Sequence, residues 1–539
     1  MIHKSIRLLI LFISLSLIIT QFGCKKYLDV NYNPRELTDS SATPEVILPP
    51  IMNQVALETD DFDNLNMWMG YWSPTLVSPG QPFLTYNNVE TSRTPPAEII
   101  YLDQKSERLG QYFYQGISKV MRALTWSMAV DEINNMPYSE AYNSTILFPK
   151  YDSGQSIYED LMNQLTTASS LIKNAEIAKN TNITNADIVF HGDRLKWLQF
   201  INTVKLRLLI HQANLPGRES YISQQIAIIK NESSGFLTVD AAENPGYGVN
   251  NKVSVYYGLY SSSNTLGGFR GGDVLNGVSS INFAHANVYA MNLLKANDDP
   301  RLGFYYSTID APIPAGAAEP FPQPGNQNFR GSQLGLVINS VQYPYQNYAN
   351  LSAVGGSRNT GVTTPFSSGI IKGNDMSNWI LTSIESRFLQ AEAIYRGWLP
   401  GSAEDAYKDA VRETFRWLNV GQNSLITAAS DAAFNQWYDL EVSKANPQVS
   451  WADAPDKYKL IMFQKYLGLN GIAPLETWTD YRRNGRFPDV PLSVDPSRVS
   501  NTLPIRLLYP HGEYQRNPVN VNAQGQINMF TGKIWWMPN

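Results

Sequence analysis

The chain has 539 residues but a single cysteine, Cys24. No disulfide can form within such a chain, so the folded state must depend on a packed core rather than on covalent cross-links. A chain of this length can bury a core of sufficient size. Aromatic residues make up 12% of the sequence. They suit a large helical core and also surfaces that stack against flat or ring-shaped ligands.

Cys24 directly follows an apolar leader. A short basic start precedes an uninterrupted apolar and serine stretch over residues 8–19. This layout is typical of a secretory signal. The stretch is shorter than the roughly 20 residues needed to span a bilayer, so a signal peptide is favoured over a transmembrane helix.

Gly23 before Cys24 indicates cleavage at this boundary and lipid attachment to the thiol, as in bacterial lipoproteins. Gln21 and Phe22 depart from the small or branched residues that usually precede such a pair. We predict a signal peptide over residues 1–23 and lipidation of Cys24. The alternative is a plain buried cysteine in a secreted protein.

The charge balance argues against one class of partner. Basic residues number 42 and acidic residues 47, which gives a formal net charge of −5. A nucleic-acid backbone requires a clustered basic surface. We therefore expect no nucleic-acid partner.

The first half of the mature chain has helical periodicity. Residues 24–50 are punctuated by four prolines and predict a tether. Apolar residues then recur at three and four positions, which predicts helices over residues 111–132, 155–174, 193–214 and 221–231. The third of these is apolar nearly all round, so we expect it to be buried between neighbours.

The middle of the chain has a different composition. Residues 233–379 are rich in Gly, Ser, Asn, Pro and Tyr. They predict long loops with a few short strands and one helix near residues 281–296. Disorder is the alternative, although the many aromatic residues can bury area that a disordered tract could not.

Helices resume near residue 380 as a pair. Apolar stripes over residues 384–398 and 403–418 flank a break at Pro400 and Gly401. Ser402 and Asp405 form a capping-box pattern at the start of the second helix. Small alanines that face large aromatics are typical of tetratricopeptide-type hairpins. An ordinary α-helical bundle gives the same pattern, and no strict 34-residue period is present.

Motifs for catalysis are absent from the sequence. The five histidines are far apart without an H-E-x-x-H pair, and there is no G-x-S-x-G turn. Glycine clusters at residues 267–272 and 355–361 lack the context of a phosphate-binding loop. Charged residues on apolar helices, such as Glu385, Glu392 and Arg483, are interpreted as buried ion pairs. We predict no catalytic residue, metal or cofactor.

Seven segments in consistent order carry a specific resemblance. They are residues 24–34, 136–142, 148–161, 192–208, 385–397, 464–488 and 505–518. Together they resemble the SusD/RagB family of outer-membrane nutrient-binding lipoproteins, and the branch called SusD-like type 2 is the most similar.

This resemblance implies a mostly α-helical fold, with a tetratricopeptide-like helix-pair scaffold and a loop-rich, ligand-binding portion. We expect one domain over residues 51–539, with the scaffold mainly in 100–232 and 380–487. The resemblance also implies a non-enzymatic lipoprotein on the outer face of the outer membrane. Such a protein acts as a lid on a SusC-like TonB-dependent transporter and delivers an oligosaccharide or peptide into it.

Ligand-binding residues are predicted from aromatic platforms flanked by polar groups. Two regions offer this mixture: the loop after Trp72 and the irregular middle of the chain. The predicted contacts are Trp72, Phe83, Tyr86, Tyr257, Tyr260, Arg270 and Tyr345. The alternative is that each aromatic only packs its own loop onto the helices.

Two other function classes stay open from the sequence alone. One is a surface-anchored hydrolase that acts on glycans, since carboxylate pairs cannot be located without a structure. The other is a helical-repeat scaffold that binds only proteins.

Overall fold

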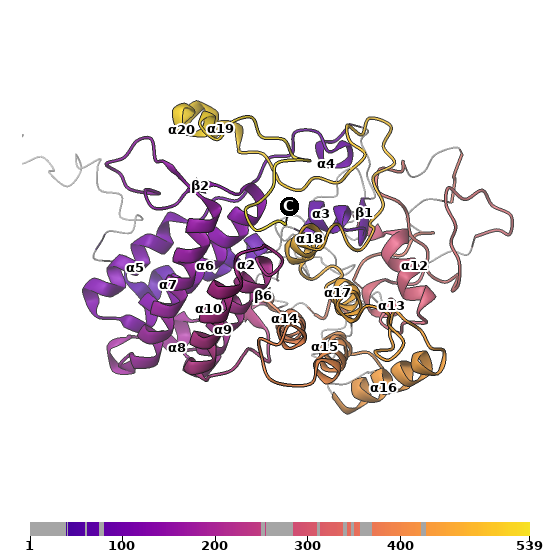
Figure 1. Cartoon of the computed structure of the whole chain (residues 1–539), viewed down its shortest axis with the longest axis horizontal. Helices are drawn as coiled ribbons and strands as arrows, with labels where there is room; N and C mark the ends of the chain where they lie inside the picture. The colour runs from indigo at the N-terminus through magenta and orange to yellow at the C-terminus, as the bar shows by residue number, and fades with distance from the viewer. Residues whose placement is uncertain are drawn as a thin grey trace, which may run out of the picture.

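The computed structural model describes residues 39, 41–59, 62–74, 80–248, 254, 284–309, 313–337, 342–345, 350–355, 369–373, 375–421 and 427–538. The fold is mostly α-helical, which confirms the expected fold class (Figure 1). Strands form three two-stranded antiparallel sheets among these residues. Much of the predicted loop-rich portion lies outside the described residues.

Helices before the middle of the chain are α2 (Pro44–Thr59), α3 (Phe62–Trp68), α4 (Pro82–Thr85), α5 (Ala97–Leu109), α6 (Tyr112–Ile133), α7 (Gly154–Asn174), the 3₁₀ turn η1 (Ile177–Lys179), α8 (Ile183–Ala186), α9 (Arg194–His211) and α10 (Glu219–Glu232). Later helices are α12 (Val288–Ala296), α13 (Leu302–Tyr305), α14 (Ser383–Tyr395), α15 (Ala403–Leu418), α16 (Thr427–Ser443), α17 (Lys457–Gly468), α18 (Pro474–Arg483), α19 (His511–Arg516) and α20 (Pro518–Asn522). The strand pairs are β1 (Trp72–Pro74) with β5 (Ala284–Ala286), β2 (Met136–Pro137) with β3 (Tyr151–Asp152), and β4 (Ala241–Glu243) with β6 (Asn378–Leu381).

The helices form a scaffold of packed neighbours. Helix α5 packs on α6, α6 on α7, and α7 on α9, while α14 packs on α15 and α17. Helix α9 also contacts α14 and so joins the two groups. In Figure 1, α5 to α10 lie on one side of the molecule, α14 to α17 lie beside them, and α12 and α13 lie beyond α17.

Glycines permit the closest helix approaches. A Cβ at Gly116 of α6 would lie 2.5 Å from Ile172 of α7. A Cβ at Gly468 of α17 would lie 2.8 Å from Thr414 and 2.9 Å from Phe388. Since real Cβ atoms do not approach so closely, the absence of a side chain at these positions allows the helices to pack as they do.

Two scaffold helices begin at capping side chains, and the first of these caps is the one that the sequence predicts. The Ser402 hydroxyl accepts a hydrogen bond from the backbone N–H of Asp405, which caps α15. Asp193 caps α9 in the same way, through the N–H of Lys196. Each such cap satisfies a backbone donor that the helix itself leaves free.

A buried arginine of the loop-rich portion, which forms an ion pair within its own segment, also binds two scaffold helices. Arg301 and Asp299 precede α13, lie 2.6 Å apart, and have fully buried side chains. Arg301 also donates to Thr414 Oγ1 of α15 at 2.9 Å and to Gln464 Oε1 of α17 at 2.8 Å. One guanidinium therefore joins three segments that are distant in sequence.

Two boundaries differ from those predicted. The tether predicted through residue 50 ends earlier, because α2 begins at Pro44 and contains Pro49 and Pro50. Prolines disfavour a helix interior, but burial of residues such as Leu48 and Ile51 outweighs that preference here. The helix predicted over residues 281–296 is also shorter: α12 begins only at Val288, and strand β5 precedes it.

Candidate functional site

Two predicted ligand contacts lie in the hydrophobic core. The side chains of Trp72 in β1 and Tyr86 after α4 have no exposed surface. The Tyr86 hydroxyl accepts a hydrogen bond from the backbone N–H of Ser493 at 2.7 Å, and burial raises the pKa of Tyr86 to about 12. A side chain without exposed surface cannot contact a ligand in this conformation. The prediction for these two residues is therefore corrected: they pack the core.

The other predicted contacts fall into two groups. Phe83 in α4 and Tyr345 are half-buried, and Phe83 also packs against the hydrophobic core. Tyr257, Tyr260 and Arg270 lie outside the described residues, as does Cys24. Contact between a ligand and Phe83 or Tyr345 stays a prediction.

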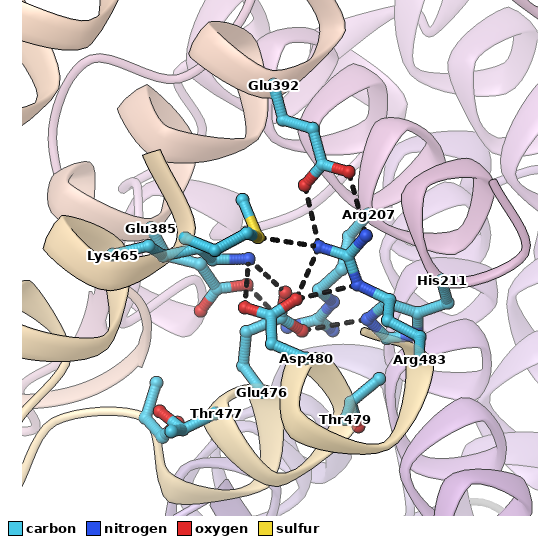
Figure 2. A network of polar contacts seen from close by, with 12 residues as sticks. Arg207, His211, Glu385, Glu392, Lys465, Glu476, Thr477, Thr479, Asp480 and Arg483 are labelled. Atoms are coloured by element: carbon cyan, nitrogen blue, oxygen red, sulfur yellow. Dashed lines mark hydrogen bonds and ion pairs between the residues drawn. The ribbon is translucent and has the colours of Figure 1, made fainter. Parts of the chain in front are cut away.

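The largest polar feature among the described residues is a buried network between helices α6, α9, α14, α17 and α18 (Figure 2). We call it the central network. Its members come from segments up to several hundred residues apart, and Figure 2 shows the charged ends of the labelled members pointing toward one another. The charged members are Asp131, Arg207, His211, Glu385, Glu392, Lys465, Glu476, Asp480 and Arg483.

A bidentate ion pair forms one end of the central network. Arg483 Nη1 and Nη2 donate to the two carboxylate oxygens of Glu392 at 2.7 and 2.6 Å. Both side chains are fully buried. Burial alone would raise the pKa of Glu392, but the charge and hydrogen bonds of Arg483 outweigh it and lower the pKa to about 2. The sequence-based interpretation of Glu392 and Arg483 as members of buried ion pairs is confirmed, and the structure pairs them with each other.

Lys465 connects two acidic residues of α18. Its Nζ lies 2.6 Å from Glu476 Oε1 and 2.8 Å from Asp480 Oδ2. Asp480 in turn accepts from Arg483 Nε at 2.7 Å. Burial would lower the pKa of Lys465, yet the two carboxylates raise it, so the ammonium stays charged in the core.

His211 is held between two carboxylates. Its Nε2 lies 2.8 Å from Glu476 Oε2, and its Nδ1 lies 3.4 Å from Asp131 Oδ2. Burial would lower the pKa of His211, but Glu476 and Asp131 outweigh it and raise the pKa to about 9. The imidazole is therefore protonated at neutral pH. The sequence analysis counts His211 only among scattered histidines, because no sequence signal links it to carboxylates 80 and 265 residues away.

Glu385 faces a cavity beside the central network. Arg207 Nη1 donates to Glu385 Oε1 at 3.2 Å, but burial outweighs this contact and raises the pKa of Glu385. The cavity has a volume of about 40 Å³ and lies between these charged groups and the apolar residues Trp379 and Ile472. The space open to solvent molecules holds about three waters, which is too small for a sugar ring.

The chemistry of the central network is that of structural ion pairs. Two carboxylates with shifted pKa values can form an acid–base pair, but here the network side chains are buried and already paired. No group of three His, Cys, Asp or Glu side chains among the described residues is arranged to hold a metal ion. Breaking such buried pairs is costly, so they fix the relative positions of the five helices.

A surface groove of about 560 Å³ lies along α10. Ile222 and Ile226 of that helix face Trp398 and Arg396, which follow α14. The groove contains none of the predicted ligand contacts. It is an opening of the helical scaffold and not of the loop-rich portion.

No helix among the described residues has the length and apolar character that a membrane crossing requires.

Comparison with known proteins identifies the family. A profile of the SusD-like family, described as starch-binding proteins associating with the outer membrane, matches residues 84–510. No curated protein matches the chain.

Several solved structures share the fold at low sequence identity. A SusD homolog from Bacteroides uniformis is 18% identical with a TM-score of 0.68, and the match covers 92% of this chain and 99% of that one. A chitin-binding SusD homolog from Flavobacterium johnsoniae is 17% identical with a TM-score of 0.66, covering 92% and 98%. A SusD/RagB family protein from Bacteroides thetaiotaomicron is 19% identical with a TM-score of 0.61, covering 92% and 99%.

The profile match spans most of the chain, and the similar structures agree with it over nearly their full lengths. The chain therefore belongs to the SusD-like family.

Proposed function

We propose that this protein is a cell-surface lipoprotein that captures an oligosaccharide, or alternatively a peptide, and passes it as a lid to a TonB-dependent outer-membrane transporter. The family match over residues 84–510 is the observation that carries the proposal. Cys24 after an apolar leader supports lipid attachment. The chitin-binding homolog makes chitin oligosaccharides the first ligands to test.

The central network supports a binding role over a catalytic one. Its carboxylates are paired and buried, and the adjacent cavity is too small for a sugar ring. Ligand contact then falls to two half-buried aromatic residues, Phe83 in α4 and Tyr345 in the loop-rich portion. Stacking on such rings is a common way to bind a sugar face.

Binding is tested by calorimetric titration of the purified protein with chitin oligosaccharides. We expect Phe83→Ala and Tyr345→Ala to weaken binding while circular dichroism stays unchanged. Tyr112→Ala is the matched control, because Tyr112 is 45% exposed on the scaffold helix α6. Equal affinity for all three variants and the unaltered protein would contradict the assigned contacts.

Transport is tested separately in cells. We expect the Cys24→Ala protein to bind ligand in solution but to fail in supporting uptake, because it is not held at the cell surface. Affinity purification of the unaltered protein should recover a TonB-dependent barrel. Turnover of the oligosaccharide would favour a hydrolase instead, and ligand-free co-purification of other proteins would favour a scaffold.

A further inference from the structure

The three most exposed large apolar side chains among the described residues lie on two neighbouring segments. Leu147 is 81% exposed, Val519 77% and Phe148 58%. We call these three residues the apolar tip. The other exposed apolar side chains are at most 55% exposed and lie on many different elements. Single exposed apolar residues are ordinary, but a cluster of the most exposed ones marks a contact surface.

Hydrogen bonds hold the two segments of the apolar tip together. Asn520 Nδ2 of α20 donates to the Phe148 carbonyl at 3.0 Å, and Asn517 Nδ2 donates to the Pro149 carbonyl at 2.7 Å. The Tyr151 hydroxyl donates to Glu513 Oε2 of α19 at 2.7 Å. The tip is therefore preformed, and its exposure is a property of the folded state.

The surroundings of the apolar tip resemble those of a membrane-surface contact. Tyr142 is 47% exposed and Tyr514 37% exposed, while the Lys150 side chain is 59% exposed and its Nζ lies 3.5 Å from Glu140 Oε1. Tyrosines and basic residues around protruding apolar groups are typical of the water–lipid boundary. In Figure 1, α19 and α20 lie at the outer edge of the molecule, beyond the scaffold helices.

Contacts through α5 link the neighbourhood of this tip to the start of the described chain. The Tyr142 hydroxyl donates to the Pro95 carbonyl, two residues before α5 begins. Further along α5, Tyr101 and Lys105 bind Asp39, where the described chain starts. Asp39 follows Cys24 by 15 residues, which span at most about 50 Å when extended. A lipid on Cys24 would therefore let this side of the molecule reach the membrane.

From these observations we propose that the apolar tip inserts into the lipid surface beside the anchor. This inference rests on the proposed lipidation of Cys24. The tip offers only three protruding side chains, whereas a stable protein interface buries about 800 Å² on each partner. The small apolar area of the tip suits a lipid surface, which deforms around it.

The single cysteine provides a direct test. When Cys24 carries lipid, Phe148→Cys introduces the one free thiol, which can be labelled with an environment-sensitive fluorophore. Leu195→Cys is the matched control, because Leu195 is 54% exposed at the start of α9. The lipidated full-length protein is bound to vesicles of phosphatidylcholine with a minor fraction of phosphatidylglycerol.

We expect the label at position 148 to shift to shorter emission wavelength, and its quenching by aqueous iodide to fall about tenfold relative to position 195. Adding Leu147→Asp and Val519→Asp should restore quenching, while circular dichroism should remain unchanged because both residues are exposed.

Equal quenching at positions 148 and 195 on vesicles would overturn the inference. Protection that requires a purified transporter barrel would also overturn it, because the tip would then be a protein interface. Flotation with the vesicles reports the lipid anchor independently. A protein that floats with position 148 still quenched refutes only insertion, whereas one that does not float refutes the anchor as well.

Discussion

The substitution Glu392→Gln tests whether the central network fixes the scaffold. Glu392 accepts two hydrogen bonds from Arg483, at 2.7 and 2.6 Å, without exposed surface on either side chain. The amide keeps the shape of the carboxylate but removes its charge, which leaves Arg483 with Asp480 as its carboxylate partner and also removes the charge that pairs with Arg396. Removing one partner of a buried pair typically costs about 3–5 kcal/mol.

The pKa of Glu392 gives an independent magnitude. The difference between about 2 in the folded chain and the ordinary 4.5 corresponds to about 3 kcal/mol of stability at neutral pH. Because the folded-state pKa is lower, this stabilisation is present above about pH 4.5 and is lost as the pH falls toward 2. Arg396, whose Nη2 lies 2.8 Å from Glu392 Oε1, contributes to this shift together with Arg483.

Urea unfolding followed by tryptophan fluorescence at pH 7 measures the effect. The matched control is Glu404→Gln, which removes an exposed ion pair with Lys408 on α15 and should cost less than about 1 kcal/mol. Ligand affinity of the Glu392→Gln protein should be unchanged under folding conditions. Equal unfolding free energies for the two variants, or a loss of affinity without loss of stability, would refute the reasoning.

Other substitutions probe further parts of the scaffold. The pKa of His211 is raised from 6.5 to about 9. The stability that the protonated imidazole contributes to the folded state is therefore fully present below about pH 6.5 and is lost as the pH rises through 9. In pH-dependent urea unfolding, His211→Gln should therefore cost about 3 kcal/mol more near pH 6 than near pH 10; a cost independent of pH would contradict this. Gly468→Ala should destabilise the protein by about 1–3 kcal/mol through crowding, whereas Gly512→Ala, which has open space in α19, should leave the urea midpoint unchanged or raise it. Arg301→Ala should cost about 3–5 kcal/mol by leaving Asp299 unpaired, and limited proteolysis should then cut near α13 at lower urea concentration than in the unaltered protein.

Helices were the most predictable part of the fold. The stripe over residues 403–418 and the cap at Ser402 match α15 residue for residue. Local signals suffice there, because periodicity and capping depend on neighbours in the sequence. The start of α2 was missed because Pro49 and Pro50 oppose a helix locally, and only tertiary burial of Leu48 and Ile51 reveals why it forms.

The candidate ligand site was much less predictable. Trp72 and Phe83 look alike in sequence as aromatics near polar residues, yet one is fully buried and the other half-buried. Burial depends on contacts that are distant in sequence, such as the Gly471 backbone that packs against the Trp72 ring. The pairing of Glu392 with Arg483 was foreseen only as a class of interaction, since 91 residues separate them.

The position of Trp536 has a consequence for the biogenesis of this protein. Its indole N–H donates to Asp131 at 2.8 Å, and its ring is fully buried. Asp131 thus receives a partner that the ribosome adds 405 residues later. A nascent chain shorter than 536 residues leaves this contact open, so folding of the interior cannot finish during synthesis of the earlier helices. Such late completion agrees with the proposed export, because a chain passes through a translocation channel unfolded.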